Sequence, residues 1–582
     1  MSIHDHAQAP AESRGRGNTS RPRARRVAVF TAATVLLSGF TATGAAHAET
    51  LPVGTGSYTT DAVGPAPEGC APLATDARAY VTDFAPAGAV PTNDWWSSLL
   101  FKKYNCVGSE PLHAHPLSCL PQAAGLGLSN TTTPTVNGTP GGIGEFHYAY
   151  AQDLIVGVAG LTAPVVEVAD WTDWTVTPSW SDGTRSMTAT IGHGLPFGDY
   201  DITGGDAVIT AGADLRVWLN DGERIGFSSG GADYVAFAPT GAAWTVAGST
   251  LTSTLDGKGY LSVAALPTSP TDTDAARTAI TDDYTPYAYA KVTGTRADFV
   301  YNEAESVVET TYSAVTEVLE GTNSGTVLSL YPHQSVYLDG VTCDGPSAGA
   351  TLDRTYVSPR GAMTTLVGAT SFTTATPFTG VLPELPAVAT GAGDANARLD
   401  ALLDQVAADP MSIDNDDTYW TGKALGRAAR IVEIADQLDR TAVRDTALAQ
   451  MKETLTDWFT ASPGETKQLF AYNDNWGTLV GFPASYGSDK KLNDHHFHYA
   501  TSSSPRRRWH ASSRSGRPAP PTAAWSTSSS RTRTTSTAPT PGTPTCATST
   551  STPATTGHPV TARSVPETTR SRALRARTSR TD

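Results

Sequence analysis

The chain has 582 residues, enough for two to four domains, and 39% of them are hydrophobic, which suffices for a sizeable core. Its 41 Lys and Arg residues face 56 Asp and Glu residues, a formal net charge of −15. This acidic balance argues against nucleic acid or an anionic membrane as the main partner.

Residues 1–48 have the pattern of a secretory signal peptide. Arg25 and Arg26 end a basic stretch that precedes the apolar run VAVFTAATVLLSGF and the small-residue sequence AHA at 46–48. A membrane anchor is the weaker interpretation, because the run is shorter than the ~20 apolar residues of a span and contains Thr, Ser and Gly. We expect a secreted mature protein without a membrane attachment, exported by the Sec pathway or, given the Arg pair, by the twin-arginine pathway.

Five cysteines fit such an oxidising compartment. They form no C-x-x-C pair, so a structural zinc site is not expected. One or two disulfides are expected among the first four, in a connectivity that the sequence leaves open. The cysteines are Cys70, Cys106, Cys119, Cys343 and Cys546.

Residues from about 55 to 310 have an all-β pattern. Short runs rich in β-formers, such as DLIVGVAG, WTVTPSW and YLSVAAL, are separated by Gly, Asp, Asn and Pro turns. They predict a large antiparallel sandwich, with Trp95 and Trp96 in its core. From about 311 to 390 the pattern is mixed: TVLSLYPHQSVYL (326–338) favours a strand, and AVTEVLEG (314–321) favours a helix.

After Gly393 the apolar residues recur at helical spacing, which predicts three consecutive amphipathic helices at the start of an all-α domain. Asp414, Asp416 and Asp417, before the second helix, are interpreted as caps and solvated charges. The apolar positions are Leu399, Leu402, Leu403 and Val406, then Leu425, Ala428, Ile431, Val432, Ala435 and Leu438, then Val443, Ala447, Met451, Leu455, Trp458 and Phe459.

Two regions concentrate aromatic, His and Asp residues. The first comprises PTNDWWSSLLFKKY (91–104) and PLHAHPLSC (111–119), and the second is LFAYNDNWGTLVGFPASYGSDKKLNDHHFHY (469–499). Aromatic rings can stack on sugars, polar side chains can hold their hydroxyls, and an Asp desolvated among rings can acquire the raised pKa of a general acid. A buried polar network at a junction between helices explains the same residue types equally well.

Metal and serine-nucleophile chemistry fit the sequence less well. The pairs His113-x-His115 and His496-x-His498 have ligand-like spacing, but no helical H-E-x-x-H accompanies them. Asp494 next to His495 lacks the G-x-S-x-G stretch of a serine hydrolase. We therefore expect neither a metal nor a cofactor.

The stretches PTNDWWSSLLF, PLHAHPLSC with the later GLGLS, and especially ASYGSDKKLNDHHFHY resemble glycoside hydrolase family 81, the endo-β-1,3-glucanases, from about Val53 to Tyr499. The resemblance implies a multidomain β + α protein: an antiparallel β-sandwich at 53–310, a small α/β linker domain at 311–393 and the start of an (α/α)6 barrel at 394–500. It also implies inverting hydrolysis of β-1,3-glucan, such as laminarin or curdlan. We expect a monomer.

The same resemblance assigns the general acid to Asp494, in D-H-H-F-H-Y. Trp476, Tyr486, His496 and His498 are interpreted as sugar-binding residues, with a structural role in the barrel wall as the open alternative. The family's general base is a Glu in a later stretch resembling N-N-Q-E-S-S-S-E, which is absent from this sequence.

Residues 501–582 have a different composition from the rest of the chain. They contain 13 Arg against Glu567 and Asp582, a local charge of +11, and lack Lys, Asn, Gln, Ile, Phe, Tyr and Met. Such a segment cannot bury a core, so we predict disorder and an incomplete barrel. A basic arm that binds polyanions through Arg506–Arg508 is one interpretation, although the total exclusion of Lys is unusual for such an arm.

A lost reading frame explains this tail better. If one base is missing at the codon for Ala500, the restored frame permits HFHYGYF across the junction, and residues 568–575 permit N-N-Q-E-S-S-S-E. Its two Glu fall at the positions of Ser571 and Arg575, neither of which can act as the base. We therefore expect the chain as it stands to have lost hydrolase activity, with a non-catalytic β-glucan-binding protein as the alternative.

Overall fold

The computed structural model describes residues 49–65, 68, 70, 78–87, 90–102, 105–132, 150–346, 349–381, 394–492 and 494–500. The predicted signal peptide (1–48) and the predicted disordered tail (501–582) lie outside the described residues. Across the described ranges, no helix combines the length and apolar character needed to cross a membrane.

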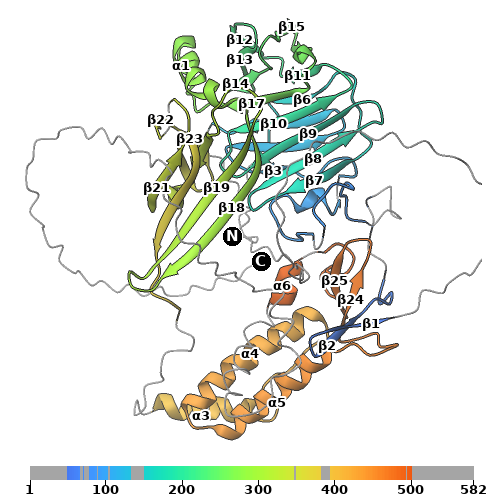
Figure 1. The fold of residues 1–582 in the computed structure, drawn as a ribbon. Helices are drawn as coiled ribbons and strands as arrows, with labels where there is room; N and C mark the ends of the chain where they lie inside the picture. The colour runs from blue at the N-terminus through green and yellow to red at the C-terminus, as the bar shows by residue number, and fades with distance from the viewer. Residues whose placement is uncertain are drawn as a thin grey trace, which may run out of the picture. The chain divides into compact units, whose positions relative to one another are not determined.

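Two antiparallel sheets form the sandwich (Figure 1). The eight-stranded sheet has the order β12 (Arg216–Asn220), β13 (Arg224–Ser229), β14 (Ala232–Phe237), β17 (Tyr260–Ala265), β10 (Phe197–Thr203), β9 (Ser186–Gly192), β8 (Thr175–Ser181) and β7 (Val166–Trp171). The seven-stranded sheet has the order β15 (Thr245–Ala247), β16 (Thr250–Ser253), β11 (Ala207–Ala211), β6 (Leu154–Val158), β5 (Gly125–Asn130), β4 (Leu117–Gln122) and β3 (Leu112–His113).

One hydrophobic core lies between these sheets, because alternate residues of each strand point inward. It contains Val156 of β6, Trp180 of β8 and Phe227 of β13, all fully buried. Trp96 is 1% exposed in the same core, and Trp95 packs against it half-buried, which confirms the prediction for both tryptophans. The β-rich N-terminal part is thus confirmed.

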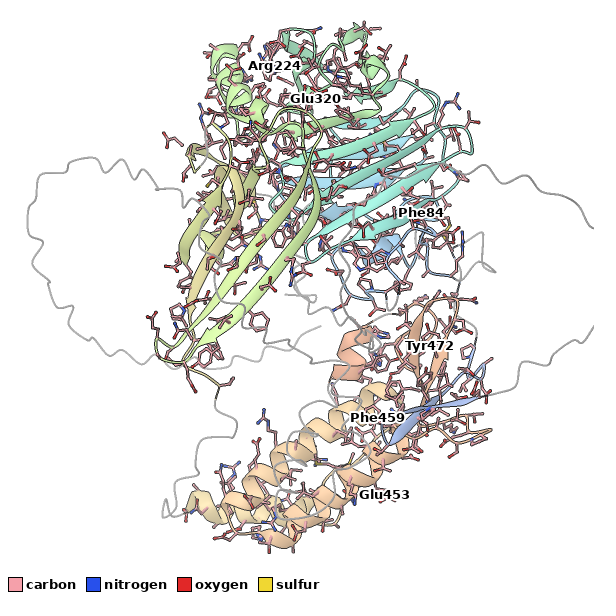
Figure 2. All side chains as sticks on the ribbon, in the orientation of Figure 1. Phe84, Arg224, Glu320, Glu453, Phe459 and Tyr472 are labelled. Carbon is pink, nitrogen blue, oxygen red and sulfur yellow. A yellow bond between two sulfur atoms is a disulfide. The ribbon has the colours of Figure 1, made fainter. Side chains whose placement is uncertain are left out.

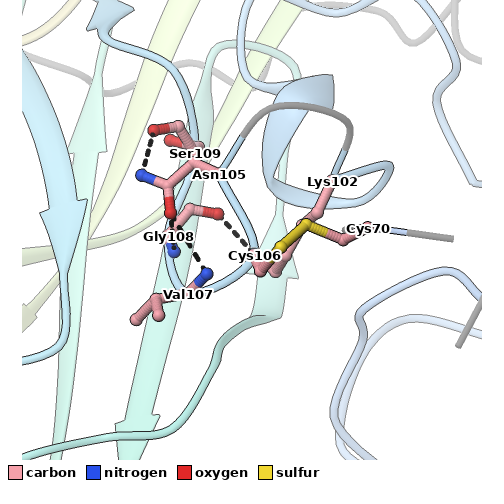
Figure 3. Close-up of a disulfide and its surroundings, with 7 residues drawn as sticks. All are labelled: Cys70, Lys102, Asn105, Cys106, Val107, Gly108 and Ser109. Carbon is pink, nitrogen blue, oxygen red and sulfur yellow. Dashed lines mark hydrogen bonds between the residues drawn. A yellow bond between two sulfur atoms is a disulfide. The ribbon is translucent and has the colours of Figure 1, made fainter. Parts of the chain in front are cut away.

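A loop before the sandwich is fixed by a disulfide between Cys70 and Cys106 (Figure 3). The Asn105 side chain accepts hydrogen bonds from the backbone N–H groups of Val107 and Gly108 and donates one to the Ser109 carbonyl. One predicted disulfide is therefore present, whereas Cys119 is a buried free thiol inside β4.

A third sheet follows α1 (Asp274–Tyr284). Its long hairpin, β18 (Ala290–Asn302) and β19 (Val307–Val318), pairs with β23 (Gly361–Pro377), which also pairs with the three remaining strands. The predicted boundary between residues 310 and 311 falls inside β19. The remaining strands are β20 (Thr326–Leu330), β21 (Leu338–Cys343) and β22 (Thr351–Ser358), with the short helix α2 (Pro332–Ser335) between β20 and β21.

The helix expected at 314–321 is wrong. Residues up to Val318 continue β19 and pair with β18 as far as Ala290. Val315 and Val318 are β-branched, and the ladder to β18 satisfies their backbone groups, so tertiary pairing overrides the local pattern. The strand expected at 326–338 is confirmed for its first five residues and then gives way to α2, where Pro332 occupies the first helical turn.

Residues 394–458 form helices, as predicted, whereas residues 469–482 of the expected all-α region form the strands β24 (Leu469–Asn473) and β25 (Thr478–Phe482) (Figure 1). The helices α3 (Asp394–Val406), α4 (Thr418–Gln437) and α5 (Thr441–Trp458) match the three predicted segments. Ala428, Val432 and Met451 are among the residues of the core between α4 and α5. The short helix α6 (His495–Ala500) follows and contacts α4.

A small four-stranded sheet joins the two ends of the described chain. Its order is β1 (Thr50–Val53), β2 (Gly56–Thr59), β24 (Leu469–Asn473) and β25 (Thr478–Phe482). Phe459, just after α5, stacks on Phe470 of β24, and Tyr472 of the same strand lies against Tyr58 of β2 (Figure 2). Sequence patterns gave no signal for this pairing.

Candidate active site

The predicted acid, Asp494, stands immediately before α6. Its side chain is exposed, and its backbone carbonyl accepts the N–H of His498 at 2.9 Å, the first turn of the helix. Its φ of 52° lies in the left-handed region, which is uncommon for a residue other than glycine. The carboxylate is therefore presented to solvent at a helix start with a constrained backbone.

His498 is held beneath Asp494 by α4. The imidazole is 3% exposed, and its Nδ1 lies 2.6 Å from the Thr418 hydroxyl. Burial lowers the pKa of His498, while the carboxylates of Asp494 and Asp417 act in the opposite direction. The neutral imidazole is thus favoured at neutral pH, so His498 supplies a fixed hydrogen-bonding group and not a permanent charge.

The N-terminus of α4 organises the loop that leads to Asp494. The Oδ1 atom of Asp417 accepts the N–H groups of Tyr419 and Trp420, both at 2.9 Å, and the Ser485 hydroxyl at 3.0 Å. The Thr418 N–H donates to the Pro483 carbonyl at 3.1 Å. Asp417 is therefore the helix cap that was expected, and it also fixes loop 483–488.

The neighbouring carboxylates Asp414 and Asp416 are exposed, in agreement with their interpretation as solvated charges.

Tyr486 is the most accessible of the predicted sugar-binding residues. Its side chain is 58% exposed and its φ is 52°. Its ring meets Tyr419 edge-to-face, with ring centroids 4.8 Å apart, and lies 6.3 Å from the His498 ring. The Tyr486 ring thus contacts Tyr419 and lies near the buried His498, whose backbone N–H donates to the Asp494 carbonyl.

The other two predicted sugar-binding residues differ from Tyr486. Trp476 is 3% exposed and packs in a core with Leu469 and Val480, and Phe101 meets its ring edge-on at 5.8 Å. Its position favours the structural alternative over a platform for sugar. The side chain of His496 lies outside the described residues.

Tyr499 of α6 lies where β25 packs closely against this helix. The Gly481 N–H donates to the Tyr499 hydroxyl at 2.9 Å, and burial raises the pKa of Tyr499 to about 12. A Cβ on Gly481 would lie 2.7 Å from Cγ2 of Thr418 and 3.1 Å from the Tyr499 ring. Glycine is therefore required where β25, α4 and α6 meet.

The described part of the chain contains no group of three His, Cys, Asp or Glu side chains able to hold a metal ion. Burial, then the neighbouring His113 and His193, lower the pKa of His115 to about 3. The His113 ring nitrogen Nδ1 lies 3.0 Å from the Ser118 hydroxyl. This pair is part of the sandwich fold.

Sequence reasoning missed the contribution of α4. Thr418, Tyr419 and Lys423 come from DTYWTGK (417–423), which was interpreted only as a helix start. The signal that could have found them is the pair of aromatic residues directly after a cap, since a helix start seldom needs two large rings.

Comparison with known proteins places these residues in context. Residues 395–501 match the glycosyl hydrolase family 81 C-terminal domain. A glucan endo-1,3-beta-D-glucosidase of Thermobifida fusca is 42% identical over 493 residues, which are 83% of this chain and 61% of that protein. A glucan endo-1,3-beta-D-glucosidase of Acetivibrio thermocellus is 39% identical over 417 residues, 71% of this chain and 50% of that protein.

A solved structure agrees with these matches. A glycoside hydrolase family 81 protein from Clostridium thermocellum, solved as a Glu-to-Ala mutant, superposes with a TM-score of 0.68 at 36% identity. The matched region covers 80% of this chain and 61% of the solved chain. The chain thus spans between one half and two thirds of the length of these relatives.

Proposed function

We propose that this chain is a frameshifted form of a secreted endo-β-1,3-glucanase whose proton donor is Asp494. The similarity to glycoside hydrolase family 81 supports this proposal. The observation that carries the proposal is the D-H-H-F-H-Y motif, whose Asp is exposed while its His498 is held by Thr418. The helices α3 to α6 are the start of its (α/α)6 barrel, and the sheet of β18 to β23 belongs to its α/β linker domain.

The chemistry follows from the inverting mechanism. A carboxylic acid protonates the oxygen of the scissile linkage, while a carboxylate about 6.5–9.5 Å away activates a water on the opposite face of the sugar. The Asp494 carboxyl supplies the proton, and the exposed Tyr486 ring, 6.3 Å from the ring of His498, contacts the sugar. The neutral His498 is suited to hydrogen-bond a sugar hydroxyl or to orient Asp494.

The stretch N-N-Q-E-S-S-S-E, which would carry the second carboxylate of this mechanism, is absent from this sequence. Asp417 cannot take the role, because its Oδ1 is engaged by three donors at the start of α4. General-base catalysis is typically worth about a hundred- to ten-thousandfold in rate. We therefore propose that the present chain has no substantial hydrolase activity and that the frame lost at Ala500 encoded the base.

The decisive experiment compares two genes for release of reducing sugar from laminarin. One encodes the chain as it stands, and the other carries one additional base at the codon for Ala500. The frame-restored protein is expected to hydrolyse laminarin with inversion, and Asp494→Asn in that protein should lower kcat by about a hundred- to ten-thousandfold. Hydrolysis by the present chain, or full activity of the Asn variant, would refute the mechanism.

A non-catalytic glucan-binding protein is the second candidate, favoured by the exposed Tyr486 ring. It predicts retention on insoluble curdlan without release of sugar by either gene product. Laminarin hydrolysis by the frame-restored protein separates the two candidates, because only the first predicts it.

A further inference from the structure

The loop that ends at Asp494 has a partner outside the helices. Glu68, in the segment that leads from β2 to the sandwich, donates its backbone N–H to the Lys490 carbonyl at 2.9 Å. One of its carboxylate oxygens lies 3.8 Å from the Lys490 ammonium, and the other lies 3.5 Å from the Lys491 ammonium. These lysines stand just before Asp494 in sequence. Glu68 thus contacts the end of this loop through one backbone bond and two ion pairs.

A disulfide anchors Glu68 to the sandwich (Figure 3). Cys70, two residues after Glu68, is bonded to Cys106. The carbonyl of Val107, next to Cys106, accepts the backbone N–H of Val166 at 2.7 Å, and Val166 is the first residue of β7. A single residue therefore separates Glu68 from a covalent link to the outermost strand of the eight-stranded sheet.

The sandwich side of this anchor is held in place. Lys102 is 5% exposed, and its Nζ donates to the Gly108 carbonyl at 2.6 Å. The Asn105 side chain accepts the backbone N–H groups of Val107 and Gly108 at 3.1 and 3.0 Å. Because both flanks of Cys106 are fixed by these bonds, the disulfide gives Cys70 a defined position.

The backbone next to Asp494 needs support from its surroundings. Leu492 and Asp494 have φ angles of 51° and 52°, in the left-handed region that large side chains avoid. Such conformations persist only where surrounding contacts enforce them. Leu492 is 6% exposed and lies in one core with Val63, which belongs to the same segment as Glu68. This segment therefore supports the loop at two places, through Val63 and through Glu68.

The ion pairs alone are too weak to hold the loop. The side chains of Glu68, Lys490 and Lys491 are between 39% and 49% exposed, and exposed ion pairs contribute little because water and salt screen them. A group that is tethered near its partner meets it at a high effective concentration, which removes much of the cost of bringing the two together. The disulfide next to Glu68 supplies such a tether.

We propose that Glu68, anchored by the Cys70–Cys106 disulfide, is a positioning residue for Asp494. With the disulfide intact, Glu68 holds loop 485–492, and the loop keeps the Asp494 carboxylate in place at the start of α6. Reduction by a dithiol breaks the S–S bond, so that Cys70 and Cys106 each gain a hydrogen, the dithiol becomes a disulfide and the loop is released. This role rests on the proposed function for what Asp494 does, but the order of the loop is measured without hydrolysis.

Hydrogen–deuterium exchange of the full present chain, read by mass spectrometry, measures the order of the loop. Its protected amides are those of Ser488 and Lys491, bonded to the carbonyls of Ser485 and Gly487. Reduction by dithiothreitol should speed their exchange by about tenfold or more, while the β18–β19 ladder stays protected over the same minutes of labelling. Unchanged exchange in the loop, or loss of protection in loop and ladder together, would overturn the proposal.

Glu68→Gln tests the carboxylate apart from the anchor, because it keeps the disulfide and the backbone bond to Lys490. It should speed exchange in the loop about two- to fivefold, and Glu68→Asp, which keeps the charge, should restore most of the protection. Glu453→Gln, in an exposed acid of α5, is the matched control and should have no effect. In the reduced protein Glu68→Gln should add nothing, since the carboxylate acts only while it is anchored. Equal effects in both redox states, or none in the oxidised state, would rule out the role of Glu68.

The frame-restored protein tests the consequence for catalysis. There Glu68→Gln should lower kcat about two- to fivefold and leave KM unchanged, because Glu68 positions the acid without contact to the sugar. A change confined to KM would assign Glu68 to binding and contradict the positioning role. If the frame-restored protein does not hydrolyse laminarin, the proposed function fails, whereas the exchange experiment still decides whether Glu68 and the disulfide hold the loop.

Discussion

Replacement of Thr418 by Val tests the contact that holds His498 beneath Asp494. The Thr418 hydroxyl lies 2.6 Å from Nδ1 of His498, and the two residues are 5% and 3% exposed. Valine keeps the shape of the side chain but removes this hydrogen bond from a buried imidazole. The loss should lower the free energy of unfolding by about 1–3 kcal/mol.

Thr421 supplies a matched control one turn along the same helix. Its residue is 3% exposed, and its hydroxyl has no hydrogen-bond partner among the described residues. The same substitution there removes a desolvated hydroxyl without breaking a bond, so Thr421→Val should be neutral or stabilising.

Urea unfolding of the full chain, followed by far-UV circular dichroism, which weights the helical part, measures both variants. With a slope of about 2 kcal/mol per M, Thr418→Val should lower the urea midpoint by about 0.5–1.5 M. The reasoning fails if the two variants shift the midpoint equally, because the hydroxyl bond to His498 is the difference between them.

Three further predictions concern stability. Burial raises the pKa of Asp199 to about 7, above its unfolded value, so stability is lost as pH rises from about 4 through 7. Asp199→Asn should therefore raise the urea midpoint at pH 8 and not at pH 4. An effect that does not depend on pH would contradict the burial argument. Reduction of the Cys70–Cys106 disulfide, which spans a sequence separation of 36, should cost about 3–4 kcal/mol by loop entropy, and an unchanged midpoint after reduction would show that the loop contributes nothing. Gly481→Ala should destabilise the protein by about 1–3 kcal/mol, because the added Cβ meets Thr418. Gly426→Ala, at a position of α4 where an added Cβ meets no atom within 4 Å, should stabilise it by about 0.5–1 kcal/mol. Equal shifts of the melting temperature in the two variants would refute the crowding at Gly481.

The predictable part of the fold was the part encoded in local periodicity. The three helices of the C-terminal region follow from apolar spacing such as that of Leu425, Ala428 and Val432, and the strands of the sandwich follow from short β-rich runs. Residues 314–321 were misassigned because residues 314–318 pair with residues 290–295 of β18, which lie outside any local window.

The candidate site was likewise predictable only in part from the sequence. The motif around Asp494 is the basis for proposing this residue as the acid, and Tyr486, on the preceding loop, is exposed. Thr418 is 80 residues from His498 in sequence, and only the packing of α4 against α6 brings them together. Trp476 had the right residue type but a buried position, which no pattern of residue types distinguishes from an exposed one.

The small sheet of β1, β2, β24 and β25 can be completed only late in synthesis. Thr59 of β2 pairs with Ala471 of β24, a partner that emerges from the ribosome more than four hundred residues later. At about 5–20 residues per second, β2 waits roughly 20–80 s for the strand that completes it. During that interval the β1–β2 hairpin has an unpaired edge, so this part of the protein needs a chaperone or rapid export more than the sandwich, whose strands find partners nearby in sequence.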